Sequence, residues 1–384
     1  MTPPARILPV IIASQFAGTS LWFAANAVLP DLQRDAGLSG QAIGWITSAV
    51  QLGFIAGTLV FALLSLADRY SPRKVFLASA LLGALANAAA IGLAGAGPLL
   101  AARFLTGFCI AGIYPVGMKI ASGWFPKDLG RALGFLVGAL VLGTAFPHLL
   151  RGLGQDWPWQ AVMLGVSLLA ALGGIGMFLL VPDGPHLAKS PPFDPAALAR
   201  VFREPGFRSS VFGYFGHMWE LYAFYAFLPF VLAARPEAPD PSLWSFAVIA
   251  AGAFGCVAGG LVSLRLGSAR VAFAQLAASG ACCLAWPVLW QAPLPLLLAF
   301  LVFWGIVVVG DSPQFSALNA ANAPREWVGS ALTIGNCIGF AITIGSLQLL
   351  DWASRSLPAE WLFVLLAPGP ALGLLALRPL LRRQ

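Results

Sequence analysis

The sequence predicts an all-α membrane protein of twelve transmembrane helices, arranged as two six-helix bundles. Of its 384 residues, 59% are hydrophobic and only 10% are charged, whereas globular domains carry about 25% charged residues. Apolar runs of about 20 residues, the length that crosses the hydrocarbon core as a helix, recur along the whole chain. A polar, proline-rich stretch lies near the middle. These observations exclude a soluble fold.

The first six predicted helices fill the N-terminal half. The first of them follows Arg6 and is too long for a cleaved signal sequence, so we expect it to remain as a membrane helix. The alternating pattern of a membrane β-barrel is not visible in this half or in the next. The expected spans are 8–30, 42–66, 74–95, 98–124, 131–151 and 161–181.

The second six predicted helices follow the polar stretch 182–208, which is rich in proline and carries four basic residues. We expect this stretch to be a cytoplasmic linker between an N-terminal bundle, 1–181, and a C-terminal bundle, 209–384. The expected spans of the second bundle are 209–233, 243–265, 270–290, 294–318, 329–350 and 361–379.

Short internal matches indicate that the two halves are repeats. Gly112–Gly117 resembles Gly305–Gly310 at an offset of 193, and Leu29-Pro30 recurs as Leu228-Pro229 at an offset of 199. Parallel repeats related by an axis along the membrane normal are known among transporters, where the substrate site lies between the halves.

The net charge is +7, but the basic residues are not clustered as a nucleic-acid footprint requires, so we expect no nucleic-acid partner. Most of them fall on one side if the N-terminus is cytoplasmic, and the positive-inside rule therefore predicts two cytoplasmic termini. The five cysteines lack metal-ligand spacing with histidine. No phosphate-cradling GxxxxGK[ST] loop is present, so we expect no metal, no cofactor, no ATP-driven pump and no enzyme.

The turn after the second predicted helix carries the strongest motif. It reads Leu64-Ser-Leu-Ala-Asp68-Arg69-Tyr-Ser71-Pro-Arg73-Lys, which resembles the loop signature of the major facilitator superfamily. Leu64 and Ser71 stand where that signature has glycine. The resemblance implies a transporter fold and a cytoplasmic gate built on Asp68, Arg69 and Arg73, the alternative being a merely solvated turn.

Two further resemblances bear on the subgroup. Leu99, Arg103 and Gly107 look like part of a motif of proton-linked members of this superfamily, with Thr106 in place of the usual glutamine. The fifth-helix signature of drug antiporters is missing from Gly134–Pro147, which disfavours multidrug efflux.

The strings Gly216–Tyr222 and Gly310–Phe315 look like those of uncharacterised bacterial facilitators that are loosely grouped with nitrate and nitrite porters. The spans 42–62 and 243–263 lack the buried arginines of those porters. Nitrate transport is therefore disfavoured.

Charged groups at membrane depth are costly and are functional candidates by default. Glu220 and Asp311 lie inside the seventh and tenth spans, and a carboxyl group that alternates between a closed and a water-filled setting can load and release a proton. We expect both to couple transport to protons, with His217 as a partner on the face of Glu220. The alternatives are a structural carboxyl group at Glu220 and a substrate contact or helix-break ligand at Asp311.

The resemblance implies that helices 1, 4, 7 and 10 line a central cavity, and five residues on helices 4, 7 and 10 are candidate substrate contacts. Lys119 also fits a lysine that reaches the cytoplasmic interface, because it lies about 160° from Arg103 on an unbroken helix. The candidates are Arg103, Tyr114, Lys119, Tyr222 and Gln314.

These residues favour a secondary active transporter in the cytoplasmic (inner) membrane. It would move a small polar or anionic solute by alternating access and would be driven by protons. Its partners would be the solute, protons and the lipid bilayer, and we expect a monomer. Proton-driven efflux of an amphipathic compound is the first alternative. The second, from another class, is a non-transporting receptor or assembly protein of the same fold.

Overall fold

The fold is described from a computed structural model, which describes residues 4–35, 37, 42–126, 129–187, 193–196, 200–238 and 240–382. Across these residues the chain forms helices and turns and no strand. The chain divides into two compact units, Met1–Pro192 and Phe193–Gln384. The division falls inside the stretch 182–208 that the sequence analysis takes for a linker.

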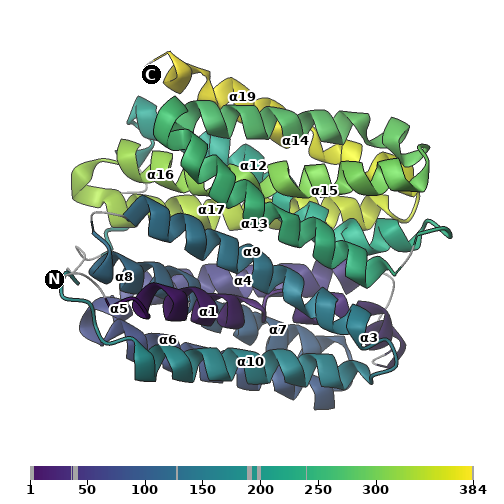
Figure 1. The fold of residues 1–384 in the computed structure, drawn as a ribbon, viewed down its shortest axis with the longest axis horizontal. Helices are drawn as coiled ribbons and strands as arrows, with labels where there is room; N and C mark the ends of the chain where they lie inside the picture. Colours follow the sequence, from purple (N-terminus) through teal and green to yellow (C-terminus); the bar gives the residue numbers. More distant parts are fainter. Residues whose placement is uncertain are drawn as a thin grey trace. The chain divides into compact units, whose positions relative to one another are not determined.

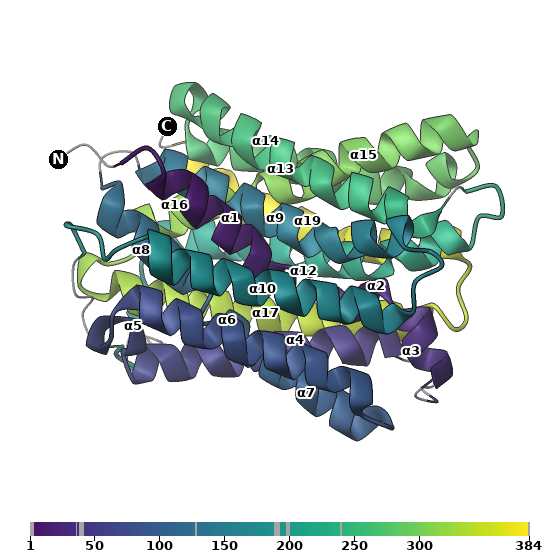
Figure 2. The same cartoon turned by 60° about the horizontal axis from the view of Figure 1, so that its bottom comes forward.

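The first unit contains the elements of the first six predicted spans. In Figure 2, α6 and α10 run side by side within it, and these two helices pack against each other. Its elements are α1 (Ile7–Thr19), α2 (Ala24–Ala27), α3 (Leu29–Asp35), α4 (Ala42–Leu63), α5 (Leu66–Arg69), α6 (Pro72–Ala89), η1 (Ala90–Gly92), α7 (Ala96–Ile110), α8 (Tyr114–Trp124), α9 (Leu129–Leu153) and α10 (Trp159–Leu180).

The second unit follows the same plan. In Figure 1, α14 and α19 lie side by side within it, and they too are in contact. Its elements are α12 (Pro205–Ala233), α13 (Pro241–Leu266), α14 (Ser268–Trp290), α15 (Leu294–Gly310), α16 (Ser312–Asn322), η2 (Arg325–Trp327), α17 (Val328–Ala353), α18 (Ala359–Leu362), η3 (Phe363–Leu366) and α19 (Pro368–Leu381).

The all-α membrane prediction is confirmed. Ten helical stretches among the described residues are long and apolar enough to cross a membrane. The other two predicted spans correspond to α1, which is apolar but has 13 residues, and to α12. The 29-residue α12 falls outside the ten because its histidine, glutamate and tyrosines lower its mean hydropathy.

Four predicted helices are broken, and the last of them, the span 361–379, runs through α18, η3 and α19. The span 8–30 divides into α1, α2 and α3, the span 98–124 divides at residues 111–113, and the span 294–318 divides at Asp311. Pro115 and Pro313 open the second segments of the latter two. A proline is well placed there, since the first turn of a helix needs no backbone donor. Hydrophobicity identifies the spans but does not reveal these interruptions.

Glycines bring α4 against α7 and α13 against α15. A Cβ on Gly107 would overlap the carbonyl oxygen of Val50, and one on Gly305 would overlap that of Val248. Small residues permit such close helix contacts in membranes, where packing replaces the hydrophobic effect as the driving force. The two units thus use the same device at the same pair of helices.

The break positions correct the register of the internal repeat. The segments α8 and α16 begin at Tyr114 and Ser312, an offset of 198, whereas the match of Gly112–Gly117 to Gly305–Gly310 implied 193. Asp311 therefore corresponds to Ile113 and not to Met118. The short glycine match was misleading because glycines recur on every tightly packed helix here.

Candidate proton-coupling and solute site

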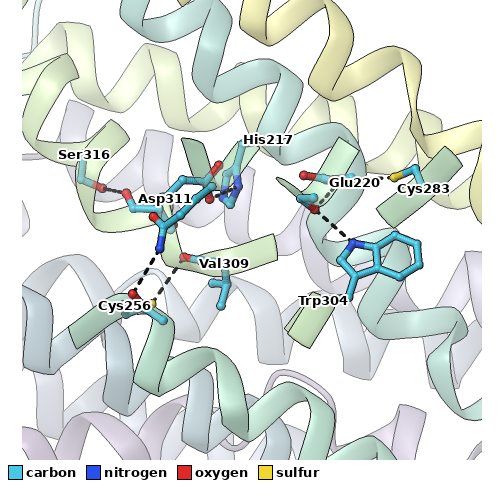
Figure 3. Close-up of polar contacts among 12 residues, drawn as sticks. His217, Glu220, Cys256, Cys283, Trp304, Val309, Asp311 and Ser316 are labelled. Carbon is cyan, nitrogen blue, oxygen red and sulfur yellow. Dashed lines mark hydrogen bonds and ion pairs between the residues drawn. The ribbon is translucent and has the colours of Figure 1, made fainter. Parts of the chain in front are cut away.

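The break in helix 10 places a carboxyl group inside the second unit. Asp311 ends α15 and precedes the first residue of α16. Its Oδ1 lies 2.8 Å from Nδ1 of His217 on α12, and both side chains are fully buried. Figure 3 shows the imidazole and the carboxyl group facing each other. Neighbouring helices thus hold an acid and a base in contact, away from water.

Glu220 points toward a different neighbour from His217, although both lie on α12. Its Oε2 accepts a hydrogen bond from the Ser279 hydroxyl at 2.9 Å and a weaker one from the Cys283 thiol at 3.6 Å, both on α14. The indole of Trp304 donates to the Ser279 hydroxyl at 3.1 Å, as Figure 3 shows. Oε1 of Glu220 has no hydrogen-bond partner among the described residues.

The two carboxyl groups interact at a distance. Glu220 is fully buried like Asp311, and the negative charges of the two groups repel each other. Loss or gain of a proton at one therefore affects the other. The predicted pairing of Glu220 with His217 does not occur in this structure, because the imidazole contacts Asp311 instead.

The segment before the break accepts one hydrogen bond from α13, and a glutamine of α14 that bonds to α13 packs beside it. The Cys256 thiol donates to the Val309 carbonyl at 3.4 Å, and Gln275 Nε2 donates to the Gly255 carbonyl at 3.4 Å. The Gln275 amide occupies the space that a Cβ on Gly310 would fill. A larger residue before Asp311 would displace that amide, so the glycine helps to fix the break.

In the first unit, Arg103 donates hydrogen bonds to the backbone at the break in helix 1. Its Nη2 donates to the carbonyl oxygens of Leu21 at 2.9 Å and Trp22 at 2.8 Å, and its Nη1 donates to Asn87 Oδ1 at 2.7 Å. The guanidinium is fully buried. These bonds satisfy carbonyls that the interrupted helix leaves unpaired. Contact with a solute stays a prediction for Arg103, whereas its positioning of helix 1 is a geometric fact.

Lys119 pairs with Asp68, the aspartate of the loop signature. The lysine lies on α8 and the aspartate on α5, and their side chains are 16% and 17% exposed. The break at residues 111–113 changes the helical phase between Arg103 and Lys119, so the expected 160° separation on an unbroken helix does not apply. Lys119 is thus an ion-pair partner of the signature aspartate.

The rest of the signature packs against α10 and the chain that follows it. Arg73 donates to the Phe178 carbonyl at 3.3 Å and stacks its guanidinium 5.3 Å from the Phe178 ring centroid. Ser71 donates to Asp183 at 2.8 Å. Arg69 is the last residue of α5. Ser65 adopts a left-handed φ of 49°, one residue after the position where the signature has glycine.

The remaining predicted solute contacts lie on three different helices. Tyr114 is the first residue of α8. Tyr222 is buried on α12, with its ring centroid 5.3 Å from that of Phe340 on α17. Gln314 is buried on α16, one turn beyond Asp311. Of these residues, only Gln314 shares a segment with the Asp311 break.

Several polar residues inside the spans were not predicted. Asn87 links Arg103 to the Met163 carbonyl at 3.1 Å and to Ser167 at 3.0 Å, and Ser279 holds Glu220. An asparagine in the middle of the apolar run 74–95 was a visible signal. A serine was not, since serine is common in membrane helices and can satisfy its own hydroxyl on the backbone.

Known relatives resemble parts of this chain. The puromycin resistance protein pur8 of Streptomyces alboniger is 33% identical over 43% of this chain and 34% of its own length. The chloramphenicol resistance protein of Streptomyces lividans is 30% identical over 48% of this chain and 46% of its own. The niacin transporter NiaP of Acinetobacter baylyi is 35% identical over 32% of this chain and 29% of its own. Each match spans less than half of the relative's length.

A family model covers far more of the sequence than any of these relatives. The model of the Major Facilitator Superfamily matches residues 11–347, which include the Asp68 loop, the break at residues 111–113 and the His217–Asp311 pair. Together with the membrane helices and the two units, this match shows that the chain is a multi-pass membrane protein of the Major Facilitator Superfamily.

Proposed function

We propose that this chain is a secondary active transporter of a small polar or anionic solute, driven by protons through Asp311, His217 and Glu220. One observation carries the proposal: His217 Nδ1 lies 2.8 Å from Asp311 Oδ1, with both side chains fully buried at the break of helix 10. Broken membrane helices are where transporters of several folds bind coupling ions.

The chemistry of the pair suits proton transfer. Buried charges in a membrane are stable only when paired or neutralised, and the imidazole and the carboxyl group in contact at 2.8 Å form such a pair. Separation of α12 from the α15–α16 break, or entry of water, would change that pairing. Glu220 adds a second fully buried carboxyl group on the same helix as His217.

The test is uptake and efflux in proteoliposomes under an imposed pH gradient. Puromycin, chloramphenicol and niacin, which the relatives' names supply, form the starting panel of solutes. Asp311→Asn and Glu220→Gln should each abolish gradient-driven accumulation while leaving exchange of solute at equal pH. Asp351→Asn is the matched control. Asp351 of α17 is also buried, but it pairs with Arg355, which follows that helix, at 3.1 Å. If both acid variants still accumulate solute, the proton assignment is wrong.

Efflux of an amphipathic compound is the second candidate. It is favoured by the two relatives that are named as resistance proteins and by the buried aromatic pair Tyr222 and Phe340. The same liposomes decide between the two directions. Efflux predicts accumulation of the drug on the acidic side of the membrane, and symport predicts accumulation on the basic side.

The Asp68–Lys119 pair is proposed as part of the cytoplasmic gate, together with Arg69 and Arg73. The positive-inside distribution supports cytoplasmic termini and a place in the cytoplasmic (inner) membrane. On this proposal the two six-helix halves, 1–181 and 209–384, alternate the exposure of one mid-membrane site, with 182–208 as their linker. The monomeric state is also part of the proposal.

A further inference from the structure

Gln51 of α4 is a fully buried amide without a hydrogen-bond partner. Both its Nε2 and its Oε1 lack a partner among the described residues, and its side chain is 0% exposed. Buried amides normally have hydrogen-bond partners, because an amide that loses its bonds to water on burial and gains none in the protein costs free energy. Gln51 lies about the middle of the span Ile43–Leu63, the depth at which transporters bind their solutes.

Two contacts place Gln51 beside the break in helix 1. On the same helix, Thr47 accepts a hydrogen bond from Asn26 Nδ2 at 2.7 Å, and the Phe54 ring centroid lies 4.9 Å from that of Trp22. Residues 47, 51 and 54 fall within about 60° of one another around a helix. Gln51 therefore shares the face that α4 presents to Trp22 and Asn26.

Asn26 contributes a second unsatisfied group. The Thr47 hydroxyl donates to the Ile43 carbonyl at 2.8 Å, so it can only accept from Asn26, and this fixes Asn26 with Nδ2 toward Thr47. Asn26 Oδ1 is then the atom left over, and it has no partner among the described residues. Asn26 is 6% exposed.

The unpartnered atoms of Gln51 and Asn26 define which hydrogen-bonding groups a ligand would need. Gln51 Nε2 offers two donors, while Gln51 Oε1 and Asn26 Oδ1 are acceptors. A carboxylate would leave both acceptors unpaired, because it carries no hydrogen. An amide or lactam carries an N–H and a C=O side by side and serves both kinds of atom. The adjoining Trp22 and Phe54 rings provide an apolar wall for a planar ring.

We propose that the helix 1 break is a binding site for a planar solute with an amide or lactam group, recognised by Gln51 and Asn26. The inference rests on the proposed transport function and names the class of solute for it. The site is closed in this structure, since the side chains of Trp22, Asn26, Gln51 and Phe54 are all buried. Entry of a solute therefore requires movement of residues 20–27, and the Arg103 hydrogen bonds to Leu21 and Trp22 hold one end of that segment.

The test is equilibrium binding of radiolabelled probes to the full chain in detergent, at one pH and without a gradient. Benzamide, 2-pyridone and uracil are the amide probes, and benzoate is the matched acid. At least one amide probe should bind, with benzoate at least about tenfold weaker. Gln51→Leu should weaken amide binding at least about tenfold, an effect the size of one lost buried hydrogen bond.

Two further variants guard against a folding artefact. Gln51→Met keeps the length of the side chain but loses both the amide donors and the oxygen acceptor, and it should also lose amide binding. Gln15→Leu removes another buried, unpartnered amide, which lies against Gly117 of α8, and it should bind the amides as the native protein does. The proposal is overturned if no amide probe binds, or if Gln51→Leu binds as tightly as the native protein.

The assay separates this inference from the proton proposal. If amide binding depends on Gln51 while the Asp311→Asn protein still accumulates solute under a pH gradient, the amide site stands and the proton coupling fails. If Gln51→Leu leaves amide binding unchanged while the Asp311→Asn protein no longer accumulates solute, the coupling stands and the amide site is overturned.

Discussion

Arg103 Nη2 donates to the carbonyl oxygen of Trp22 at 2.8 Å, across the break in helix 1. The cation is fully buried, and it donates to two carbonyls and to the neutral Asn87 amide. The break in helix 10 carries the opposite kind of group, the Asp311 carboxyl with its imidazole partner. In each unit, a buried ionisable side chain thus lies at the break of an interrupted helix.

Arg103→Met should destabilise the protein by about 3 kcal/mol, because it leaves the Leu21 and Trp22 carbonyls and the Asn87 amide without donors inside the membrane. Thermal unfolding in detergent measures the effect. Arg34→Met is the control, since Arg34 is 71% exposed in its pair with Asp31 and exposed pairs contribute little. Equal midpoints for the two variants would refute the role given to Arg103.

Reversing the charges of the Asp68–Lys119 pair tests whether the contact itself is needed. Asp68→Lys and Lys119→Asp should each lower the transport rate, because each places like charges together in a partly buried site. The double variant restores attraction and should recover part of the rate. Initial rates in proteoliposomes measure this, normalised to the protein inserted. A double variant slower than both single variants would show that the aspartate acts through other partners.

Gly107→Ala should destabilise the first unit by about 1–3 kcal/mol, since the added methyl group overlaps the Val50 carbonyl oxygen and forces α7 away from α4. Gly305→Ala should do the same in the second unit at Val248. Gly260→Ala is a matched control with open space around its Cβ position. Thermal midpoints of the three variants that agree within error would contradict the close-packing account.

The sequence was sufficient for the spans and insufficient for their breaks. Long apolar runs predict membrane helices because the bilayer demands them, and Glu220, His217 and Asp311 stood out because charge is rare there. The partners of these residues depend on how helices pack, which a single sequence does not determine. The phase arithmetic between Arg103 and Lys119 holds only for an unbroken helix, and it does not apply here because a break at residues 111–113 lies between them.

The polar residues that were missed are neutral. Gln51 and Ser279 carry no charge, so they did not stand out against the apolar runs in which they lie, although Gln51 is fully buried and Ser279 holds Glu220. Their importance comes from what surrounds them in three dimensions. A serine that bonds to a carboxylate and a serine that bonds to its own helix look the same in a sequence.

The His217–Asp311 contact predicts a strongly non-additive pair of variants. His217→Leu leaves the Asp311 carboxyl buried without its partner, and removal of one member of a buried pair costs about 3–5 kcal/mol. Asp311→Asn leaves the imidazole beside a neutral amide and should be milder. The double variant His217→Leu with Asp311→Leu replaces both polar groups by apolar ones, and it should be more stable than His217→Leu alone.

Thermal unfolding of His217→Leu, Asp311→Leu, the double variant and the native protein forms a double-mutant cycle, which measures the interaction between the two side chains. The same proteins in pH-gradient liposomes separate stability from coupling. The double variant should be folded and yet unable to accumulate solute, since it has an apolar break in place of a proton site. Additive destabilisation within about 0.5 kcal/mol would mean that the two groups do not interact, and the proton proposal would then lose its main support.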